Sequence, residues 1–330
     1  MDAVERDFID EWCERYAEIS AGNRDRLALL KTLFEKVDRA GLRVLPLKGT
    51  DLLLRSYGGL GLRPMYDSDW WVHPQDVDAV GSLLRAEGFI CSRPADTFWR
   101  MSFFDESMDY VSSGNQWVID LQWTFWFLAE GASFWERARP CHTPIGRRLM
   151  LLPEDALFIQ IAEVIGRRGW ASTLFRQDLE TLLRSDGHVI DWPRWTQTVK
   201  TLGLMPVIYC GLTRALAAGL ENFPPSVLTA LKPKSWADKS RGWLLDRLVA
   251  RTAAPRIQYL LHWVAQPTGR ARRTLLRRVL WPAKAWRERR LGRPLRWSEA
   301  PAFVFRPLRL LLRAIFFGTQ ELWKLFPFSS

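Results

Sequence analysis

Residues 42–72, LRVLPLKGTDLLLRSYGGLGLRPMYDSDWWV, decide the fold of this chain. Their first apolar run stops at a glycine, and the leucine-rich run that follows predicts a short helix with Thr50 as its cap. After a glycine-rich loop, residues 65–72 are rich in aromatic side chains and lie between two prolines, as expected for a strand. The stretch therefore predicts a strand, a tight turn, a helix and a second strand.

The remaining patterns predict a mixed α/β sheet of the α+β class, with helices before and after it. Residues 1–40 have the apolar spacing of a helix, and residues 75–87 form a second helical pattern that ends at Gly88. Three further strands are expected in FWRMSFF, MDYV and NQWVIDLQWTF, and the sequence after residue 150 is helical. The expected domains are a helical cap (1–40), a catalytic domain (41–150), a helical domain (151–269) and a basic amphipathic tail (270–330).

Several classes of site are disfavoured by the residues themselves. The four cysteines contain no CxxC pair, which argues against a zinc knuckle or a disulfide framework and favours a reducing cytoplasm. The histidines are scattered without an HExxH motif, and neither a GxGxxG, a Walker lysine motif nor a GxSxG motif occurs. The acidic N-terminus predicts no secretory signal, and no apolar run is long enough to predict a membrane-spanning helix.

Three aspartates are the candidate metal ligands. Asp67 and Asp69 are two residues apart in an expected strand, so their side chains share one face, where two like charges favour a cation between them. Asp120 lies in WVIDLQW among apolar residues. The alternatives are solvated turn residues for the first two and a strand-edge or ion-paired aspartate for the third. Carboxylate oxygens are the ligands that Mg²⁺ prefers.

A phosphate-binding turn is expected after the first apolar run, where the short helix begins. Lys48, Gly49 and Thr50 lie at the head of the predicted helix, where backbone N–H groups and the helix dipole favour an anion. Arg63 and Arg55 are further candidates for binding a phosphate or a carboxylate, with solvated surface arginines as the alternative.

Taken in order, LPLKGTDLLLRSY, LRPMYDSDWWV and VIDLQW resemble the uncharacterised nucleotidyltransferase family of bacteria, a branch of the DNA polymerase β-like superfamily. The resemblance covers about residues 40–230 and extends into LLPEDALFIQIAEV and RQDLETLL. It implies nucleotide-phosphate roles for Lys48, Gly49, Thr50 and Arg63. It implies that Asp67, Asp69 and Asp120 are catalytic and hold two Mg²⁺ ions. This sequence departs from the family pattern at Gln122 and Glu163, where histidine is usual, and at Ser68 and Trp70.

The resemblance implies a magnesium-dependent enzyme that moves a nucleoside monophosphate from an NTP such as ATP to an acceptor hydroxyl. The first two aspartates would bridge both ions, and Asp120 would act on the attacking hydroxyl. The acceptor is not identified; surface-polysaccharide and modified-peptide biosynthesis are suggested only by analogy. The alternatives are a noncatalytic nucleotide-sensing or scaffold module, and an antitoxin-like protein that transfers AMP to a protein.

The sequence leaves open the roles of two groups of residues, the tryptophans near the strands and the basic tail. The tryptophans near the expected strands either stack on a base or sugar or fill the core; they are Trp70, Trp71, Trp117, Trp123 and Trp126. Residues 270–330 hold 15 of the 47 Lys and Arg residues and three of the 36 acids, interleaved with Trp, Phe and Leu. This pattern favours either a peripheral helix on the inner membrane face or a helix docked on the body, and nucleic-acid binding less.

Overall fold

The computed structural model describes residues 3–92, 107–114, 117–125, 127, 132–167, 173–250, 255–280 and 288. Its elements, in chain order, are α1 (Ala3–Arg39), β1 (Val44–Leu47), α2 (Lys48–Arg55), η1 (Leu60–Leu62), β2 (Asp67–Val72), α3 (Val77–Ala86), β3 (Ile90–Cys91), β4 (Ser107–Val111), β5 (Val118–Gln122), α4 (Ala132–Arg137), β6 (Arg139–Thr143), β7 (Gly146–Met150), α5 (Pro153–Arg167), α6 (Thr173–Asp186), α7 (Trp192–Thr201), α8 (Met205–Ala217), α9 (Pro225–Leu231), α10 (Trp236–Val249), α11 (Pro255–Ala265) and α12 (Gly269–Leu280).

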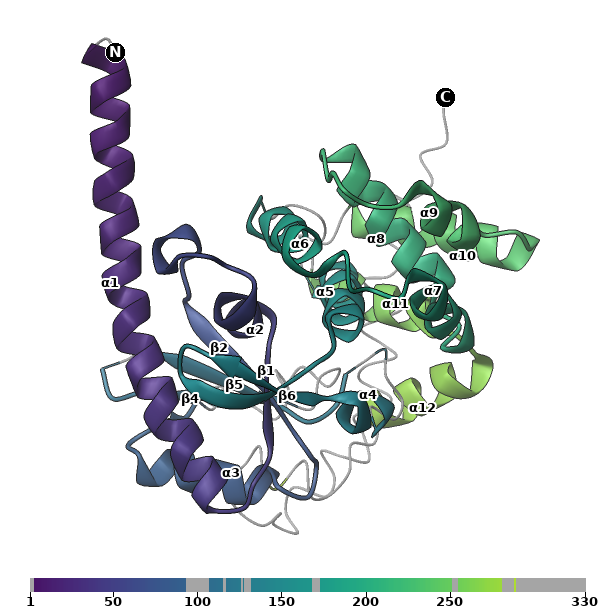
Figure 1. The fold of residues 1–330 in the computed structure, drawn as a ribbon. Helices are drawn as coiled ribbons and strands as arrows, with labels where there is room; N and C mark the ends of the chain where they lie inside the picture. Colours follow the sequence, from purple (N-terminus) through teal and green to yellow (C-terminus); the bar gives the residue numbers. More distant parts are fainter. Residues whose placement is uncertain are drawn as a thin grey trace.

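A five-stranded mixed sheet forms the centre of the first half, in the order β1-β2-β5-β4-β3 (Figure 1). Strands β2 and β5 are parallel, and the other neighbours are antiparallel. The mixed α+β fold and the strands expected in MYDSDWWV, MDYV and WVIDLQW are confirmed. The strand predicted in FWRMSFF lies outside the described residues.

The two faces of the sheet belong to different apolar clusters because alternate residues of each strand point to opposite sides. Trp70 and Val72 join a cluster with the buried side of α1 and with α3. Trp71, on the other face, joins a larger cluster with α5 and the helices after it. The sheet therefore lies between the first helices of the chain and the helical second half.

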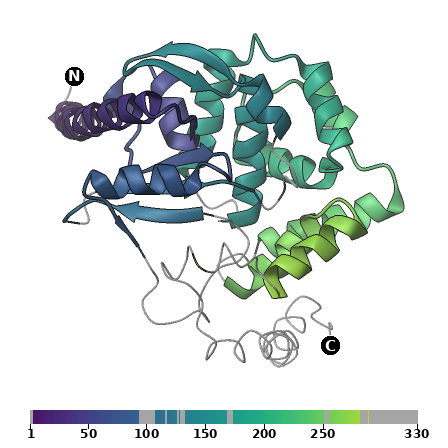
Figure 2. The ribbon, with the colours of Figure 1, turned by 90° about the horizontal axis from the view of Figure 1, so that it is seen from below.

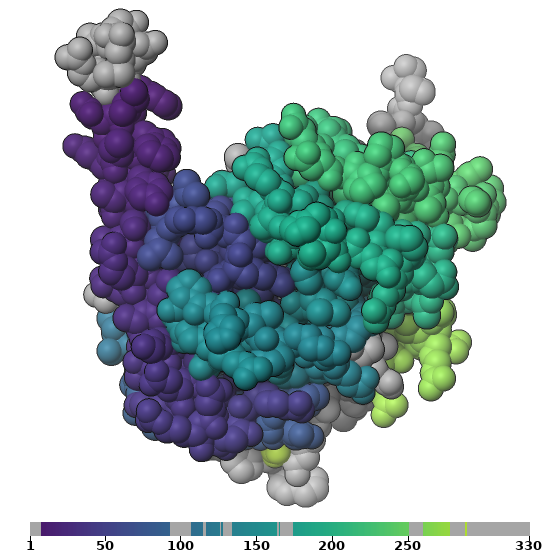
Figure 3. Space-filling model, in the orientation of Figure 1, coloured from purple at the N-terminus to yellow at the C-terminus, as the bar shows by residue number. Residues whose placement is uncertain are grey.

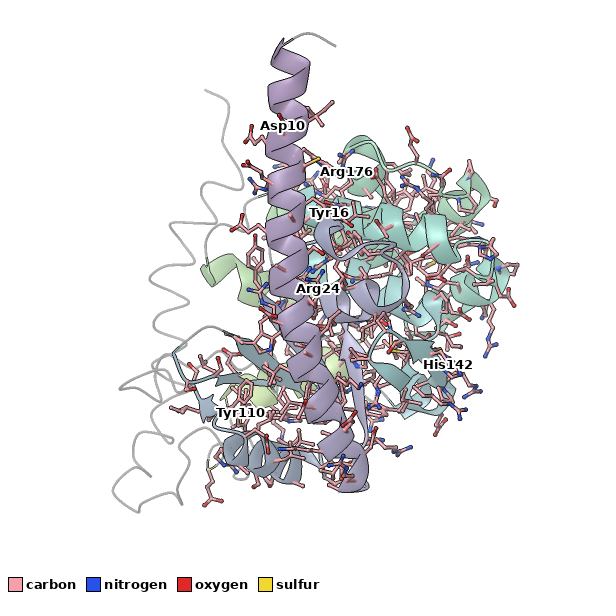
Figure 4. All side chains as sticks on the ribbon, turned by 60° about the vertical axis from the view of Figure 1, so that its left-hand side comes forward. Asp10, Tyr16, Arg24, Tyr110, His142 and Arg176 are labelled. Carbon is pink, nitrogen blue, oxygen red and sulfur yellow. The ribbon has the colours of Figure 1, made fainter. Side chains whose placement is uncertain are left out.

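Helix α1 is bound to the body along its C-terminal half. Its buried residues follow the helical spacing that the sequence predicted, and they are Leu27, Leu30, Leu33, Phe34 and Val37. The N-terminal half projects beyond the other described elements, with Phe8 and Trp12 exposed (Figures 1 and 3). Figure 4 labels Asp10 on this projecting half and Tyr16 nearer the body. A Cβ atom on Gly61 would collide with Tyr16, so the glycine-rich loop is a packing element against α1.

The second half of the described chain is helical, as expected. Figure 2 shows α11 and α12 on the opposite side of the molecule from α1. Helix α12 holds the first part of the predicted basic tail and packs on α11, with Leu275 buried and Arg272 5.0 Å from the ring centroid of Trp263. The tail helix expected around residues 306–316 lies outside the described residues. In the described part of the chain, no helix combines the length and apolar character needed to cross a bilayer.

One local expectation is wrong, and one element was not predicted. The unpredicted element is the antiparallel ribbon β6–β7. Thr50 does not cap α2, since the helix already begins at Lys48 after Leu47, and the Thr50 hydroxyl donates instead to Ser68 Oγ at 2.9 Å.

Candidate active site

A row of aspartates crosses three neighbouring strands of the sheet. Asp69 on β2 is opposite Asp120 on β5, and Asp120 is opposite Asp109 on β4. Residues that are paired across a ladder project from the same face, so the three carboxylates share the face that packs toward the helical half. The sequence analysis identified Asp69 and Asp120 but missed Asp109, because its place in this row depends on the strand register.

Asp67 begins β2 on the same face as Asp69. Its side chain is exposed, whereas Asp69 and Asp120 are 8% and 9% exposed. Asp109, at the other end of the row, is also exposed, so the carboxylates are buried at Asp69 and Asp120 and open to solvent at Asp67 and Asp109.

Gln122 links the two buried carboxylates. Its Nε2 donates to Asp69 Oδ1 at 3.0 Å and to Asp120 Oδ2 at 2.7 Å, and its side chain is buried. One amide nitrogen thus contacts an oxygen from each strand, so the two carboxylates are close neighbours. The sequence singled out Gln122 only as a departure from histidine, and the structure shows which groups it contacts.

The ammonium group of Lys48 contacts Asp69, one of these two carboxylates. It has a φ of 50°, a left-handed conformation that is uncommon outside glycine, at the junction between β1 and α2. Its Nζ donates to Asp69 Oδ1 at 2.8 Å and forms an ion pair with Glu163 Oε2 of α5 at 3.1 Å. The strained backbone therefore directs the ammonium into the aspartate row.

The environment of Asp69 opposes its negative charge. The pKa of Asp69 is raised to about 6: burial is the largest cause, Lys48 acts in the opposite direction, and the charges of Asp120 and Asp67 add to the increase. The ionised form of this carboxylate is therefore less favourable than that of an exposed aspartate, and a bound cation would reduce this cost.

The residues of the predicted phosphate turn have specific neighbours. A Cβ atom on Gly49 would collide with the guanidinium of Arg63, so glycine is required there by packing against an arginine. The Thr50 hydroxyl bonds to Ser68, whose side chain lies on the opposite face of β2 from Asp69. Among the described residues, no side chain caps the start of α2.

Arg63 forms a buried pair with Asp178 of α6. Its Nε and Nη2 donate to the two carboxylate oxygens at 2.7 and 2.9 Å, and the Tyr57 hydroxyl donates to the same carboxylate at 2.9 Å. Arg55 is likewise engaged, with Asp51 at 2.6 Å and with the carbonyl of Leu151. The nucleotide-phosphate role of Arg63 stays a prediction. The sequence analysis allowed a carboxylate partner for each arginine, and the structure shows that this partner is Asp178 for Arg63 and Asp51 for Arg55.

Two further expectations can be compared with the packing. Of the tryptophans near the strands, those that the structure describes are at most 3% exposed and belong to the core; they are Trp70, Trp71, Trp117 and Trp123. Trp126 lies outside the described residues. Within the described ranges, no three His, Cys, Asp or Glu side chains are arranged as a metal site, so the metal-ligand roles stay predictions.

The comparisons with known proteins identify a family. A family model described as uncharacterised nucleotidyltransferase matches residues 1–219, which includes α1. A nucleotidyltransferase-like antigenic protein of Paracoccidioides brasiliensis aligns at 16% identity and a TM-score of 0.37, over 63% of this chain and 92% of that one. The nucleotidyltransferase toxin MenT4 of Mycobacterium tuberculosis H37Rv aligns at 14% and 0.42, over 82% and 97%. No curated protein matched. The chain belongs to the uncharacterised nucleotidyltransferase family, and it is a nucleotidyltransferase.

Proposed function

We propose that this enzyme moves a nucleoside monophosphate from an NTP to an acceptor hydroxyl at the aspartate row on β2 and β5. The observation that carries the proposal is the register that sets Asp69 opposite Asp120, with Gln122 bonded to both carboxylates. Like charges on directly opposite residues destabilise a sheet, so a binding role accounts for their presence better than a structural one.

The donor set fits a divalent cation. Asp69 and Asp120 offer neighbouring buried oxygens, and the exposed Asp67 lies on the same face of β2 as Asp69. When bound, two Mg²⁺ ions would neutralise the phosphate oxygens and lower the pKa of the attacking hydroxyl. Asp67 and Asp69 would hold both ions, and Asp120 the ion on the acceptor side.

The phosphates of the NTP would bind at the start of α2. The helix dipole and the first-turn amides of Gly49 and Thr50 attract an anion, and Lys48 supplies a full positive charge beside them. Since the Thr50 hydroxyl already bonds to Ser68, we assign Thr50 a role through its backbone N–H. For Arg63 we propose a phosphate contact through the guanidinium that lies beside Gly49.

In the reaction, the acceptor oxygen forms a bond to the α-phosphorus while the bond to the β-phosphate oxygen breaks and pyrophosphate leaves. Asp120 would orient the acceptor hydroxyl and take its proton.

Surface-polysaccharide and modified-peptide biosynthesis are the settings that we propose for the acceptor. A nucleotide-sensing module without turnover, and AMP transfer to a protein hydroxyl, are the competing hypotheses. Incubation of the protein and a cell extract with each α-labelled NTP separates them by the chemical nature of the labelled product.

Mg²⁺ with the correct NTP is expected to raise the melting temperature, because a ligand that binds only the folded state stabilises it. A concentration 100 times the Kd contributes about 2.7 kcal/mol. The measurement is a thermal melt with each of ATP, CTP, GTP and UTP, for the wild type and for the Asp67→Asn, Asp69→Asn double variant. Equal shifts in both proteins would remove these carboxylates from the nucleotide site.

For residues 270–330 we propose attachment to the inner membrane face. Their 15 basic and three acidic residues alternate with Trp, Leu and Phe, and each basic residue near an anionic surface contributes about 1 kcal/mol. We expect the full chain to sediment with anionic vesicles and not with neutral ones, and a version ending at residue 269 to lose this binding. A folded truncated protein that sediments equally well would show that the tail is not the anchor.

A further inference from the structure

Glu163 is a buried carboxylate to which the mechanism above gives no role. It lies on α5 and is 5% exposed. Its neighbours on the helix are buried and apolar, so packing fixes its position; they are Phe158, Ile159, Ile161, Ala162 and Ile165. A carboxylate in such surroundings is costly unless it is close to a cation, and Lys48 Nζ lies 3.1 Å from Oε2.

Lys48 is thereby held between two carboxylates from different parts of the molecule. Asp69 belongs to the sheet, at 2.8 Å, and Glu163 belongs to the helical half. Together with the amide of Gln122, these contacts form one continuous chain of polar groups from Asp120 on β5 to Glu163 on α5.

The two carboxylates differ in what happens when a divalent cation binds. A divalent cation on Asp69 would weaken the hold of that carboxylate on the ammonium of Lys48, because the two positive charges repel each other. With Asp69 as its only anion, Lys48 would compete with the cation. A second carboxylate in contact with Nζ reduces that competition and favours the charged ammonium beside the first turn of α2.

We propose that Glu163 is a positioning residue that holds Lys48 at the phosphate turn when Asp69 binds a divalent cation. The inference rests on the proposed function and adds the residue that sets the place of the lysine. Glu163 itself contacts neither the nucleotide nor the reacting atoms in this role.

The test is a double-mutant cycle on nucleotide binding. The Kd of ATP, CTP, GTP and UTP with Mg²⁺ is measured by calorimetry for the wild type, Glu163→Gln, Lys48→Met and the double variant. We expect Glu163→Gln to weaken binding about tenfold, the size of one charge-assisted hydrogen bond, and Glu163→Asp to recover part of the loss. In the Lys48→Met background the same change should have less than about a twofold effect, since the lysine through which it acts is absent.

Glu87→Gln is the matched control, because Glu87 also pairs with a lysine, Lys36, at 2.5 Å, but on α1 and at the end of α3. It should leave the nucleotide Kd unchanged. The melting temperature of each variant without ligand shows whether it folds; if Glu163→Gln does not, Glu163→Asp takes its place in the cycle.

The outcomes are separable. An equal loss in both backgrounds, or no loss from Glu163→Gln, would overturn the positioning role while leaving the proposed function in place. If the wild type binds none of the four nucleotides, the proposed function itself fails and the role of Glu163 fails with it.

Discussion

Asp69→Asn is expected to reduce nucleotidyl transfer by about 10³-fold or more, because it removes a charge proposed to hold both Mg²⁺ ions, each worth several kcal/mol in the transition state. The amide is nearly isosteric and can still accept a hydrogen bond, so the packing around β2 should change little. Lys48 and Gln122 both donate to Asp69 Oδ1, and the amide oxygen of an asparagine has two lone pairs that can accept both hydrogen bonds. The effect should therefore fall on kcat rather than on folding.

The measurement is the rate at which label from an α-labelled NTP appears in the acceptor. A γ-labelled NTP is the negative control, because its label leaves with pyrophosphate. Asp38→Asn is the control, since Asp38 also pairs with an arginine, Arg148, at 2.7 Å, but lies on α1 with an exposed side chain. It should leave the rate unchanged. Transfer by Asp69→Asn at more than about a tenth of the wild-type rate would contradict the proposed catalytic role.

The strands and helices that carry the site could be predicted because their signals are local. In β2, aromatic residues follow directly on the aspartates between two prolines, and in α1 the apolar residues recur with the helical period. The ribbon β6–β7 was missed because its sequences, RPCHT and GRRLM, contain proline, glycine and three arginines, and its first strand is mostly exposed. Because apolar and polar residues do not alternate in these two segments, they lack the sequence pattern of a strand.

The start of α2 shows how a backbone detail escapes a sequence rule. Threonine is a residue type that often caps helices. However, Lys48 adopts a left-handed conformation, and the helix begins there, two residues before Thr50. The aspartates Asp67 and Asp69 were found because their spacing alone puts them on one face. Asp109 was not found, because its place opposite Asp120 depends on which strands pair and in which register.

The contacts between the sheet and the helical half are the part that no local pattern reveals. Arg63 and Asp178 are 115 residues apart in the chain, and no pattern in either segment indicates that they pair. The pairing of Lys48 with Glu163 is likewise not indicated by either segment. The sequence identified which residues could carry chemistry, whereas the fold determines which of them meet.

Asp178→Asn is expected to destabilise the protein by about 3–5 kcal/mol, because it leaves the guanidinium of Arg63 buried without its anion. The Arg63 and Asp178 side chains are only 10% and 7% exposed, and the pair has two parallel hydrogen bonds. The measurement is the free energy of unfolding from urea denaturation, followed by tryptophan fluorescence. Cooperative unfolding with an unchanged m-value would show that the variant starts from the same fold.

Asp246→Asn provides the matched control, because Asp246 also pairs with an arginine, Arg214, at 2.7 Å, but its side chain is 59% exposed. Solvent screens such a pair, so its loss should cost less than about 1 kcal/mol. The double variant Arg63→Met, Asp178→Leu replaces both buried charges by apolar groups and should recover much of the stability lost in Asp178→Asn. If Asp178→Asn costs no more than Asp246→Asn, the buried pair does not hold α6 to the loop that precedes β2. The guanidinium of Arg63 could then contact a phosphate without giving up a stabilising ion pair with Asp178.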